Sequence, residues 1–240
     1  MSNMFIRIQA NVPPTVGKIN PSDIDLFLPY DPEALAFWNF TSGSLVSANS
    51  QSQVLTAQGG YSLTDNALVA KTGGSNNLLT SYIESGEFSF SGVIDMSQAT
   101  SAAMVIAGNF MSSPESGAAI YLTGAGKLAT RAASKISILD DLPDMTKPLF
   151  YAVSVSASTP LLSVVIKQPG RLDFSATGAF FPSPYVSSTS PLLIGSLAGG
   201  QSSNVKTYEF AIYNEALSLE GLNRKYLEAQ VRMKGVAISI

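Results

Sequence analysis

SPLLIGSLAGGQSSNVKTYEFAIYNEALSLEGLNRKYLEAQVRMKG, residues 190–235, joins four kinds of sequence in direct succession. A short apolar run, a Gly/Ser-rich loop, an alternating run and a charged amphipathic segment follow one another. In the alternating run, Tyr208, Phe210 and Ile212 share one face of a strand that we expect to be covered mainly on that side. The order predicts a strand, a loop, a second strand and a late helix packed on a β-rich body.

The amphipathic segment predicts one helix over residues 218–234. Apolar residues recur there at helical spacing, at Leu222, Tyr226, Ala229 and Met233. Ser218 can cap the first turn, because its hydroxyl can accept a hydrogen bond from a backbone N–H. Gly235 offers a left-handed stop, and VAISI, residues 236–240, predicts a short final strand.

The middle of the chain predicts a series of short strands bounded by Gly, Ser, Asn or Pro. They lie at residues 66–71, 88–96, 103–110, 118–123, 128–132, 149–157, 161–167, 171–177 and 191–195. Residues 123–127, 157–160 and 168–170 supply turn chemistry for hairpins between neighbouring strands. This regular spacing favours a β-sandwich over alternating βαβ units.

The first 33 residues predict an extended N-terminal arm, and residues 34–240 predict one domain. Prolines at positions 13, 14, 21, 29 and 32 interrupt regular structure in the arm, since proline lacks a backbone donor. The arm also carries Phe5, Ile6, Leu26, Phe27 and Leu28, which need a surface to pack on. We expect that surface to be a neighbouring copy in a homotrimer; the alternative is an edge strand on the arm's own sandwich.

Composition narrows the possible chemistry. The 240 residues are 45% apolar and 13% charged, with net charge −3, so a large core is expected. No run of Lys or Arg is present, so neither nucleic acid nor an anionic membrane surface is an expected partner. The absence of cysteine and histidine excludes disulfides, thiolate nucleophiles, Cys/His zinc sites and Ser-His-Asp triads. No apolar run approaches the roughly 18 residues of a membrane span, so no membrane insertion is expected.

Several segments resemble the laminin-G-like, concanavalin A-like jelly-roll superfamily. ALAFWNFTSGSL (residues 34–45) is similar to its opening strand, and GEFSFSGVIDM and LFYAVSVSA to two inner strands. The closing block of residues 190–226 is the most specific match, and the resemblance covers residues 34–228. It implies an all-β, concanavalin A-like jelly-roll β-sandwich with an extended N-terminal arm and one C-terminal helix. The central strand lacks the tryptophan usual in that family, and Gly221 and Leu222 replace a frequent Glu-Ile pair, which puts an inherited function in doubt.

Retaining hydrolases of this superfamily carry carboxylates in an E-x-D-x-x-E strand, because two carboxyls must flank the scissile bond. No such run occurs here, so we expect a protein that is not an enzyme. Glu84 and Glu87 have opposite strand parity and are interpreted as a pair flanking a turn.

Sugar binding is predicted from an aromatic platform and planar polar partners. Tyr185, in a Pro/Ser-rich loop, is the candidate platform, whereas Trp38 is expected in the core. Asn76 and Asn77, in TGGSNN, are candidate hydrogen-bonding partners, although Gly, Ser and Asn are also ordinary turn residues. No cofactor is required; Asp140, Asp141 and Asp144 are candidate Ca²⁺ ligands, with a solvated acidic loop as the alternative.

These features lead to the hypothesis of a bacteriophage tail fibre or other virion protein. It would recognise a bacterial surface polysaccharide or lipopolysaccharide and assemble with other virion proteins. The start, MSNMFIRIQANVPP, does not resemble a secretory signal, so synthesis in the host cytoplasm and release in the virion are expected. Two alternatives stay open: a purely structural virion subunit without glycan binding, and a glycan-cleaving enzyme of the same fold.

Overall fold

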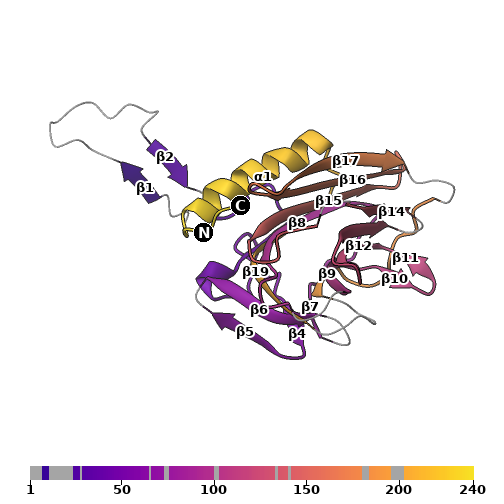
Figure 1. The fold of residues 1–240 in the computed structure, drawn as a ribbon, viewed down its shortest axis with the longest axis horizontal. Helices are drawn as coiled ribbons and strands as arrows, with labels where there is room; N and C mark the ends of the chain where they lie inside the picture. The colour runs from indigo at the N-terminus through magenta and orange to yellow at the C-terminus, as the bar shows by residue number, and fades with distance from the viewer. Residues whose placement is uncertain are drawn as a thin grey trace.

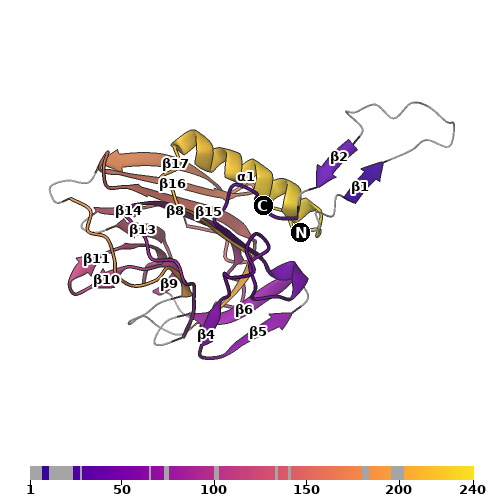
Figure 2. The ribbon, with the colours of Figure 1, turned by 180° about the vertical axis from the view of Figure 1, so that it is seen from behind.

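The computed structural model describes residues 7–10, 24–27, 29–64, 66–72, 76–99, 103–132, 135–139, 142–179, 184–195 and 203–240. Two antiparallel β-sheets stack face to face, and one helix, α1 (Leu219–Lys234), lies on the outer face of the larger sheet (Figure 1). The view from behind shows the same three layers (Figure 2). The predicted all-β jelly-roll sandwich with one C-terminal helix is therefore confirmed.

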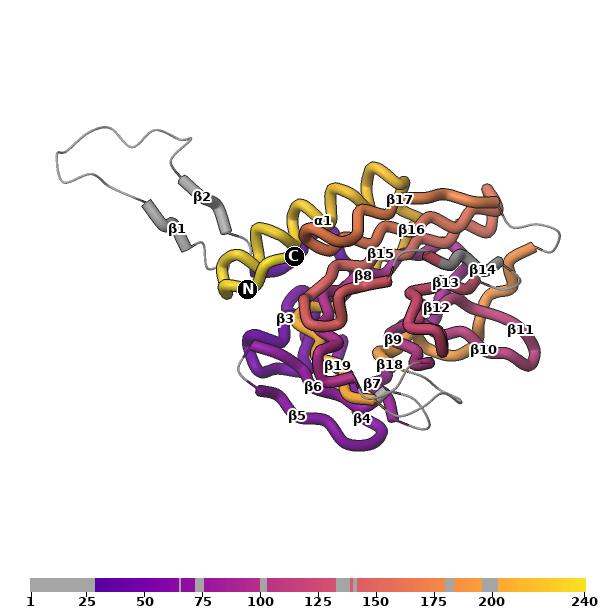
Figure 3. Tube along the Cα trace, in the orientation of Figure 1, coloured from indigo at the N-terminus to yellow at the C-terminus, as the bar shows by residue number. Residues whose placement is uncertain are grey.

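The larger sheet contains eight strands and carries the helix. Its order is β17 (Leu172–Ala179), β16 (Leu161–Gln168), β15 (Leu149–Ser156), β8 (Glu87–Asp95), β19 (Ser203–Tyr213), β6 (Ala67–Thr72) and β5 (Tyr61–Thr64). An eighth strand, β3 (Ala36–Asn39), pairs with β19 beside this path (Figure 3). A 3₁₀ turn, η2 (Phe40–Ser42), follows β3.

The smaller sheet contains seven strands. Its order is β14 (Lys135–Ile138), β13 (Leu128–Ala132), β12 (Ala118–Leu122), β9 (Met104–Gly108), β18 (Leu193–Gly195), β7 (Asn77–Leu79) and β4 (Thr56–Gln58). Two further pairs belong to neither sheet: β10 (Met111–Ser112) with β11 (Glu115–Ser116), and β1 (Arg7–Ala10) with β2 (Ile24–Phe27).

The three predicted hairpin turns connect the expected strands. Leu122 pairs with Leu128 across the first turn, Ser156 with Leu161 across the second, and Gln168 with Leu172 across the third. In the first turn Gly126 has φ 75°, a left-handed conformation that glycine adopts without a Cβ penalty. Turn chemistry in the sequence therefore predicted the local pairing of both sheets.

The core lies between the two sheets and is rich in aromatic side chains. Trp38 is fully buried as expected; its ring stacks on Phe210 with centroids 6.0 Å apart, and its indole N–H donates to the Leu45 carbonyl over 2.9 Å. Phe90 lies against Phe210 and Tyr151 in the same cluster. These rings all come from the larger sheet and form part of the core between the two sheets.

Strand β19 departs from the predicted alternation at one point. Phe210 and Ile212 face the core between the sheets, but Tyr208 packs in the cluster beneath α1. The pairing of β19 with β8 shifts register between Thr207 and Glu209, which inserts one extra residue and reverses the parity. The prediction that Tyr208 shares the face of Phe210 is therefore wrong. The other face of β19 is not exposed either, because α1 and the segment before β3 cover it.

The helix begins where the sequence indicated, since the Ser218 hydroxyl accepts from the Gly221 N–H over 3.1 Å. Its end differs from the prediction. Gly235 adopts the right-handed helical conformation, with φ −61°, instead of the predicted left-handed one. The positive φ occurs two residues later, at Ala237, where φ is 61°. Residues 236–240 form turns and a coil that folds back on α1, so the predicted final strand is absent from this described segment.

No helix in the described ranges combines the length and apolar character needed to cross a bilayer.

The segment just before β3 is part of the packed body. Asp31 is completely buried, and Tyr30 packs beside Ala34 and Phe37. The predicted boundary between residues 33 and 34 therefore lies inside a segment that contacts the sandwich. Within the described chain, β1 and β2 pair with each other and join neither sheet of the sandwich.

Candidate functional site

Tyr185 does not offer the exposed ring that a sugar platform requires. It is 8% exposed, and its ring lies against Phe88 with centroids 6.4 Å apart. Its hydroxyl donates to Glu84 Oε1 over 2.6 Å, and burial together with the Glu84 charge raises the pKa of Tyr185. The expectation of an exposed Tyr185 is therefore wrong, because a buried carboxylate draws the loop onto the sandwich.

Glu84 has a structural role in that arrangement. Besides Tyr185, it accepts hydrogen bonds from the backbone N–H groups of Ser188 and Gly86, both over 2.7 Å. A buried carboxylate with several donors holds a loop firmly, because each hydrogen bond offsets part of the free-energy cost of burying its charge. This agrees with interpreting Glu84 and Glu87 as residues that flank a turn.

The two asparagines lie at the start of β7. Asn77 is 2% exposed and pairs with Gly195 of β18 and Gln58 of β4. Its burial in this strand removes it from the candidate sugar ligands, because a buried side chain does not reach a ligand in solvent. Asn76 is half-buried, and a Cβ added at Gly59 would lie 2.2 Å from its Oδ1. Its role in binding stays a prediction.

The predicted calcium ligands fall partly outside the described residues, since Asp140 and Asp141 are not among them. Asp144 accepts hydrogen bonds from the Thr146 N–H and hydroxyl, and Lys147 lies 3.1 Å away. Chiefly because of Thr146, the pKa of Asp144 falls to about 2. Within the described ranges no three acidic side chains gather as a metal site would require, and calcium binding stays a prediction.

A different cluster, on the outer face of the smaller sheet, has the chemistry of a ligand site. We call it the Arg131 cluster; it comprises Phe110, Glu115, Tyr121 and Arg131. Tyr121 pairs directly with Ala129, and Arg131 follows two residues later on the same face of β13. All four residues are partly exposed. Their sheet is opposite the helix-covered one, so α1 does not cover them (Figure 1).

Arg131 is the centre of this cluster. Its guanidinium carbon lies 4.5 Å from the centroid of the Phe110 ring. Its Nη2 and Nε donate to Glu115 Oε1 over 2.8 and 3.2 Å. Burial raises the pKa of Tyr121, and the nearby Arg131 charge opposes that rise. The guanidinium thus lies over an aromatic ring and is bonded twice to a carboxylate.

The chain around the β10–β11 pair is shaped to place Phe110 and Glu115 over β13. Asn109 is buried, and its side chain accepts from the Ala118 N–H over 3.0 Å at the base of the pair. Gly117 has φ 76°, and a Cβ there would lie 2.5 Å from the Asn109 carbonyl oxygen. Only glycine allows this close approach. The tight base fixes the pair relative to the sheet.

The groups of the Arg131 cluster have the chemistry that a polyhydroxylated ring requires. Arg131 and Glu115 retain a donor nitrogen and an acceptor oxygen beyond their mutual bonds, which suit neighbouring hydroxyl groups. Phe110 and Tyr121 add apolar ring surface for the C–H face of a sugar. Sequence reasoning missed this cluster because the glutamate and arginine lie 16 residues apart. The available signal was Arg131 itself, a charge at an outward position in the alternating run LATRA.

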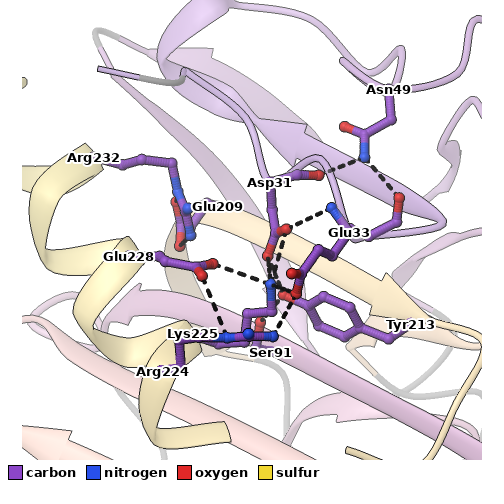
Figure 4. A network of polar contacts seen from close by, with 11 residues as sticks. Asp31, Glu33, Asn49, Ser91, Glu209, Tyr213, Arg224, Lys225, Glu228 and Arg232 are labelled. Atoms are coloured by element: carbon purple, nitrogen blue, oxygen red, sulfur yellow. Dashed lines mark hydrogen bonds and ion pairs between the residues drawn. The ribbon is translucent and has the colours of Figure 1, made fainter. Parts of the chain in front are cut away.

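A second polar cluster lies beneath α1 (Figure 4); Lys225 and Asp31 are buried at its centre, whereas Glu33 and Glu228 are partly exposed. Lys225, only 1% exposed, donates to Asp31 over 3.0 Å, to Glu33 over 2.7 Å and to Glu228 over 3.1 Å. The Tyr213 hydroxyl donates to Asp31 over 2.7 Å. Burial acts to raise the pKa of Asp31, but the bonds from Lys225 and Tyr213 outweigh it and the pKa is lowered.

Arg232 and Glu209 form the neighbouring buried pair. Two parallel bonds of 2.8 and 3.0 Å join the guanidinium and the carboxylate, and the guanidinium also lies over the Phe37 ring. Burial acts to lower the pKa of Arg232, but the Glu209 charge raises it overall. Each charged group of this second cluster that the structure describes has a partner of opposite charge. The cluster holds α1 and the segment before β3 onto β19. We therefore interpret its groups as structural and not as ligand-binding.

The architecture matches known structures, although the sequence does not. No protein-family model matches the chain, and no curated protein matches it in sequence. The botulinum neurotoxin serotype D binding domain is 13% identical, with a TM-score of 0.60 over 83% of this chain and 53% of that one. The chain thus spans about half the length of the neurotoxin domains that it matches.

Two other solved structures share the fold. Trypanosoma rangeli sialidase in complex with sialic acid is 11% identical, with a TM-score of 0.57 over 89% of this chain and 36% of that one. Domain 4 of AbnA, an extracellular arabinanase from Geobacillus stearothermophilus, in complex with arabinotriose, is 17% identical. Its TM-score is 0.56, over 80% of this chain and 97% of that domain. At such identities the likeness establishes the β-sandwich fold alone.

Proposed function

We propose that this protein is a glycan-binding protein without enzymatic activity, and that the Arg131 cluster is its sugar site. The observation that carries the proposal is the placement of the Arg131 guanidinium over the Phe110 ring, in an ion pair with the Glu115 carboxylate. Planar polar groups beside exposed aromatic rings recognise sugars because hydroxyl pairs need matched donors and acceptors while the ring faces are apolar.

Proteins of similar fold support the proposal in general terms. Structures of the neurotoxin binding domains include complexes with SialylT and N-acetylneuraminic acid, and the AbnA domain was solved with arabinotriose. The fold itself hosts many functions, so the argument for this chain depends on the residues of the Arg131 cluster.

The bonding of the carboxylates supports the proposal of binding without cleavage. Glycoside hydrolysis uses two carboxyl groups on opposite sides of the bond. Glu115 is paired with Arg131, and the buried carboxylates Glu84, Asp31, Glu209 and Asp95 are each bonded to donors of the fold. Carboxylates that already accept such bonds are poorly suited to donate a proton to a glycosidic oxygen.

The finer assignment is a phage virion protein that recognises a bacterial surface polysaccharide or lipopolysaccharide. It stays a prediction from the sequence, as does the alternative of a structural virion subunit. The genes beside its own test the virion role, because tail or baseplate genes would be expected there.

A glycan array with the full chain tests the sugar proposal. We expect a bound glycan, at least about tenfold weaker binding by Phe110→Ala, and unchanged binding by Ile83→Ala, an exposed apolar residue outside the cluster. Absence of any bound glycan, or equal binding by Phe110→Ala, contradicts the proposal. Incubation with the bound polysaccharide should leave its chain length unchanged; steady shortening contradicts the non-enzymatic part.

A further inference from the structure

The positive charge of the Arg131 cluster is already compensated by a carboxylate. Arg131 Nη2 and Nε both donate to Glu115 Oε1, over 2.8 and 3.2 Å. The two side chains are 34% and 36% exposed, so a ligand can approach both of them. A ligand that reaches the guanidinium therefore meets the carboxylate beside it and experiences little net charge.

The strands around this ion pair contribute little further charge. Within residues 103–132 the charged residues are Glu115, Lys127 and Arg131. Lys127 lies at the turn between β12 and β13, four positions before Arg131, which is about 13 Å along an extended chain. This separation is longer than the Debye length of about 8 Å at physiological salt, so the Lys127 charge is largely screened from the pair.

The loop that lies against the base of the β10–β11 pair is uncharged. The Gly117 N–H donates to the Val186 carbonyl over 2.8 Å, which joins residues 184–195 to that base. These residues include no Lys, Arg, Asp or Glu, whereas Ser187 and Thr189 are exposed hydroxyl groups. This loop therefore supplies no second cation that would receive an anionic ligand.

The open atoms of the ion pair match hydroxyl groups better than a carboxylate. Because both bonds end at Oε1, Glu115 Oε2 and Arg131 Nη1 have no partner among the described residues. An ionised carboxylate oxygen only accepts hydrogen bonds, so Oε2 requires a donor from the ligand. A sugar hydroxyl donates and accepts, whereas the carboxylate of an acidic sugar only accepts and is repelled by Glu115. Two neighbouring hydroxyls thus satisfy both atoms, and a carboxylate satisfies Arg131 alone.

We propose that the Arg131 cluster selects uncharged hexoses and discriminates against their acidic counterparts, and that Glu115 is the residue that sets this selectivity. The inference rests on the proposed function, because it concerns the same site. Glu115 compensates Arg131, accepts a hydroxyl through Oε2 and repels a carboxylate. Phe110 and Tyr121 contact the sugar ring whatever its charge. Selectivity of this kind comes from a penalty on the wrong ligand as much as from contacts with the right one.

Matched glycans test this selectivity with the full chain. The probes are glucose, galactose and mannose oligosaccharides, each beside the same oligosaccharide with its primary alcohols oxidised to carboxylates. We expect the wild type to bind an uncharged form at least about tenfold more tightly than its oxidised counterpart. Glu115→Gln should reduce this preference at least about tenfold, because the amide oxygen still accepts from Arg131 while the repelling charge is gone. The gained binding of the oxidised form should weaken as salt is added.

Glu220→Gln is the matched control, since it removes one exposed carboxylate at the start of α1 and changes the net charge equally. It should keep the wild-type preference; an equal change in both variants would assign the preference to net charge and overturn the proposal. Binding of an oxidised form as tightly as the uncharged one, with loss in Phe110→Ala, refutes the selectivity but supports the glycan site. Binding to none of these hexoses also refutes the inference, while the wider glycan array decides the proposed function separately.

Discussion

Lys225 Nζ lies 2.9 Å from Asp31 Oδ2, and these two residues, 194 positions apart in the sequence, are 1% and 0% exposed. The bond joins the last helix to the segment before the first strand of the sandwich (Figure 4). Two charges removed from water are tolerated only when each satisfies the other and further groups complete their hydrogen bonds. The Tyr213 hydroxyl donates a further hydrogen bond to Asp31, and Glu33 and Glu228 are the further partners of the Lys225 ammonium.

The first prediction is that Lys225→Met lowers the free energy of unfolding by about 3–5 kcal/mol, because it leaves Asp31 buried without its cation. Urea denaturation measures the change. Arg224→Met is the control on the same helix; Arg224 is half exposed in its ion pair with Glu33, so a loss of about 0–1 kcal/mol is expected.

A double-mutant cycle checks the cause of that loss. Adding Asp31→Asn to Lys225→Met should recover part of the stability, because the uncompensated charge is then gone. Additive losses from the two substitutions would contradict a direct coupling between these residues.

The second prediction concerns acid. Asp31 has a folded-state pKa below its usual 3.8, so its ionised form stabilises the fold fully above about pH 3.8. That contribution disappears as pH falls through the lowered folded-state pKa. Asp31→Asn should flatten the dependence of unfolding free energy on pH in this acid range.

Alkali should act on the other partner. Bonds to Glu33 and Asp31 outweigh burial and raise the pKa of Lys225 above 10.5. The stabilisation is therefore complete below pH 10.5 and is lost as pH rises through the raised value. Denaturation series on the wild type and Lys225→Met, at both ends of the pH scale, measure these contributions; identical profiles for the two proteins would refute the assignment.

The sequence predicted the sandwich because local chemistry specifies hairpins and alternation. Turn residues at positions 123–127 and 168–170 lie between strands that do pair, and Ser218 does cap α1. The errors have local causes. One extra residue near Tyr208 reversed the parity of β19, and the tail folds onto α1 by side-chain bonds that periodicity cannot reveal.

The site was less predictable than the fold. Tyr185 lies in a loop whose composition suggests exposure, yet its burial depends on Glu84, a contact over 101 residues. The Arg131 cluster likewise depends on which strands become neighbours, since Glu115 reaches Arg131 only through the packing of the β10–β11 pair. Long-range pairing of this kind has no signature in a single sequence.

The third prediction is that Phe210→Ala destabilises the protein by about 3–5 kcal/mol, because it empties a fully buried position stacked on Trp38. Thermal and urea unfolding measure the loss. Ile83→Ala, at an exposed position, should change stability by no more than about 0.5 kcal/mol. A near-neutral effect of Phe210→Ala would mean that β19 turns its other face to the core.

The last prediction is that Arg131→Lys weakens glycan binding at least about tenfold while leaving the fold intact. Lysine keeps the charge but lacks the planar fork that stacks on Phe110 and donates twice to Glu115. Stability should change little, by about 0–1 kcal/mol, because the Arg131 side chain is 34% exposed and solvent screens its ion pair.

The matched control is Arg171→Lys, an exposed arginine that donates to the Leu142 carbonyl at the β16–β17 turn. Titration calorimetry with the glycan found on the array compares both variants with the wild type. A loss of affinity confined to Arg131→Lys places the sugar on the planar guanidinium of the smaller sheet. Equal affinity for all three proteins would mean that the planar guanidinium does not contact the sugar. Lysine keeps the charge of arginine and lacks only the planar fork, so the comparison tests that group.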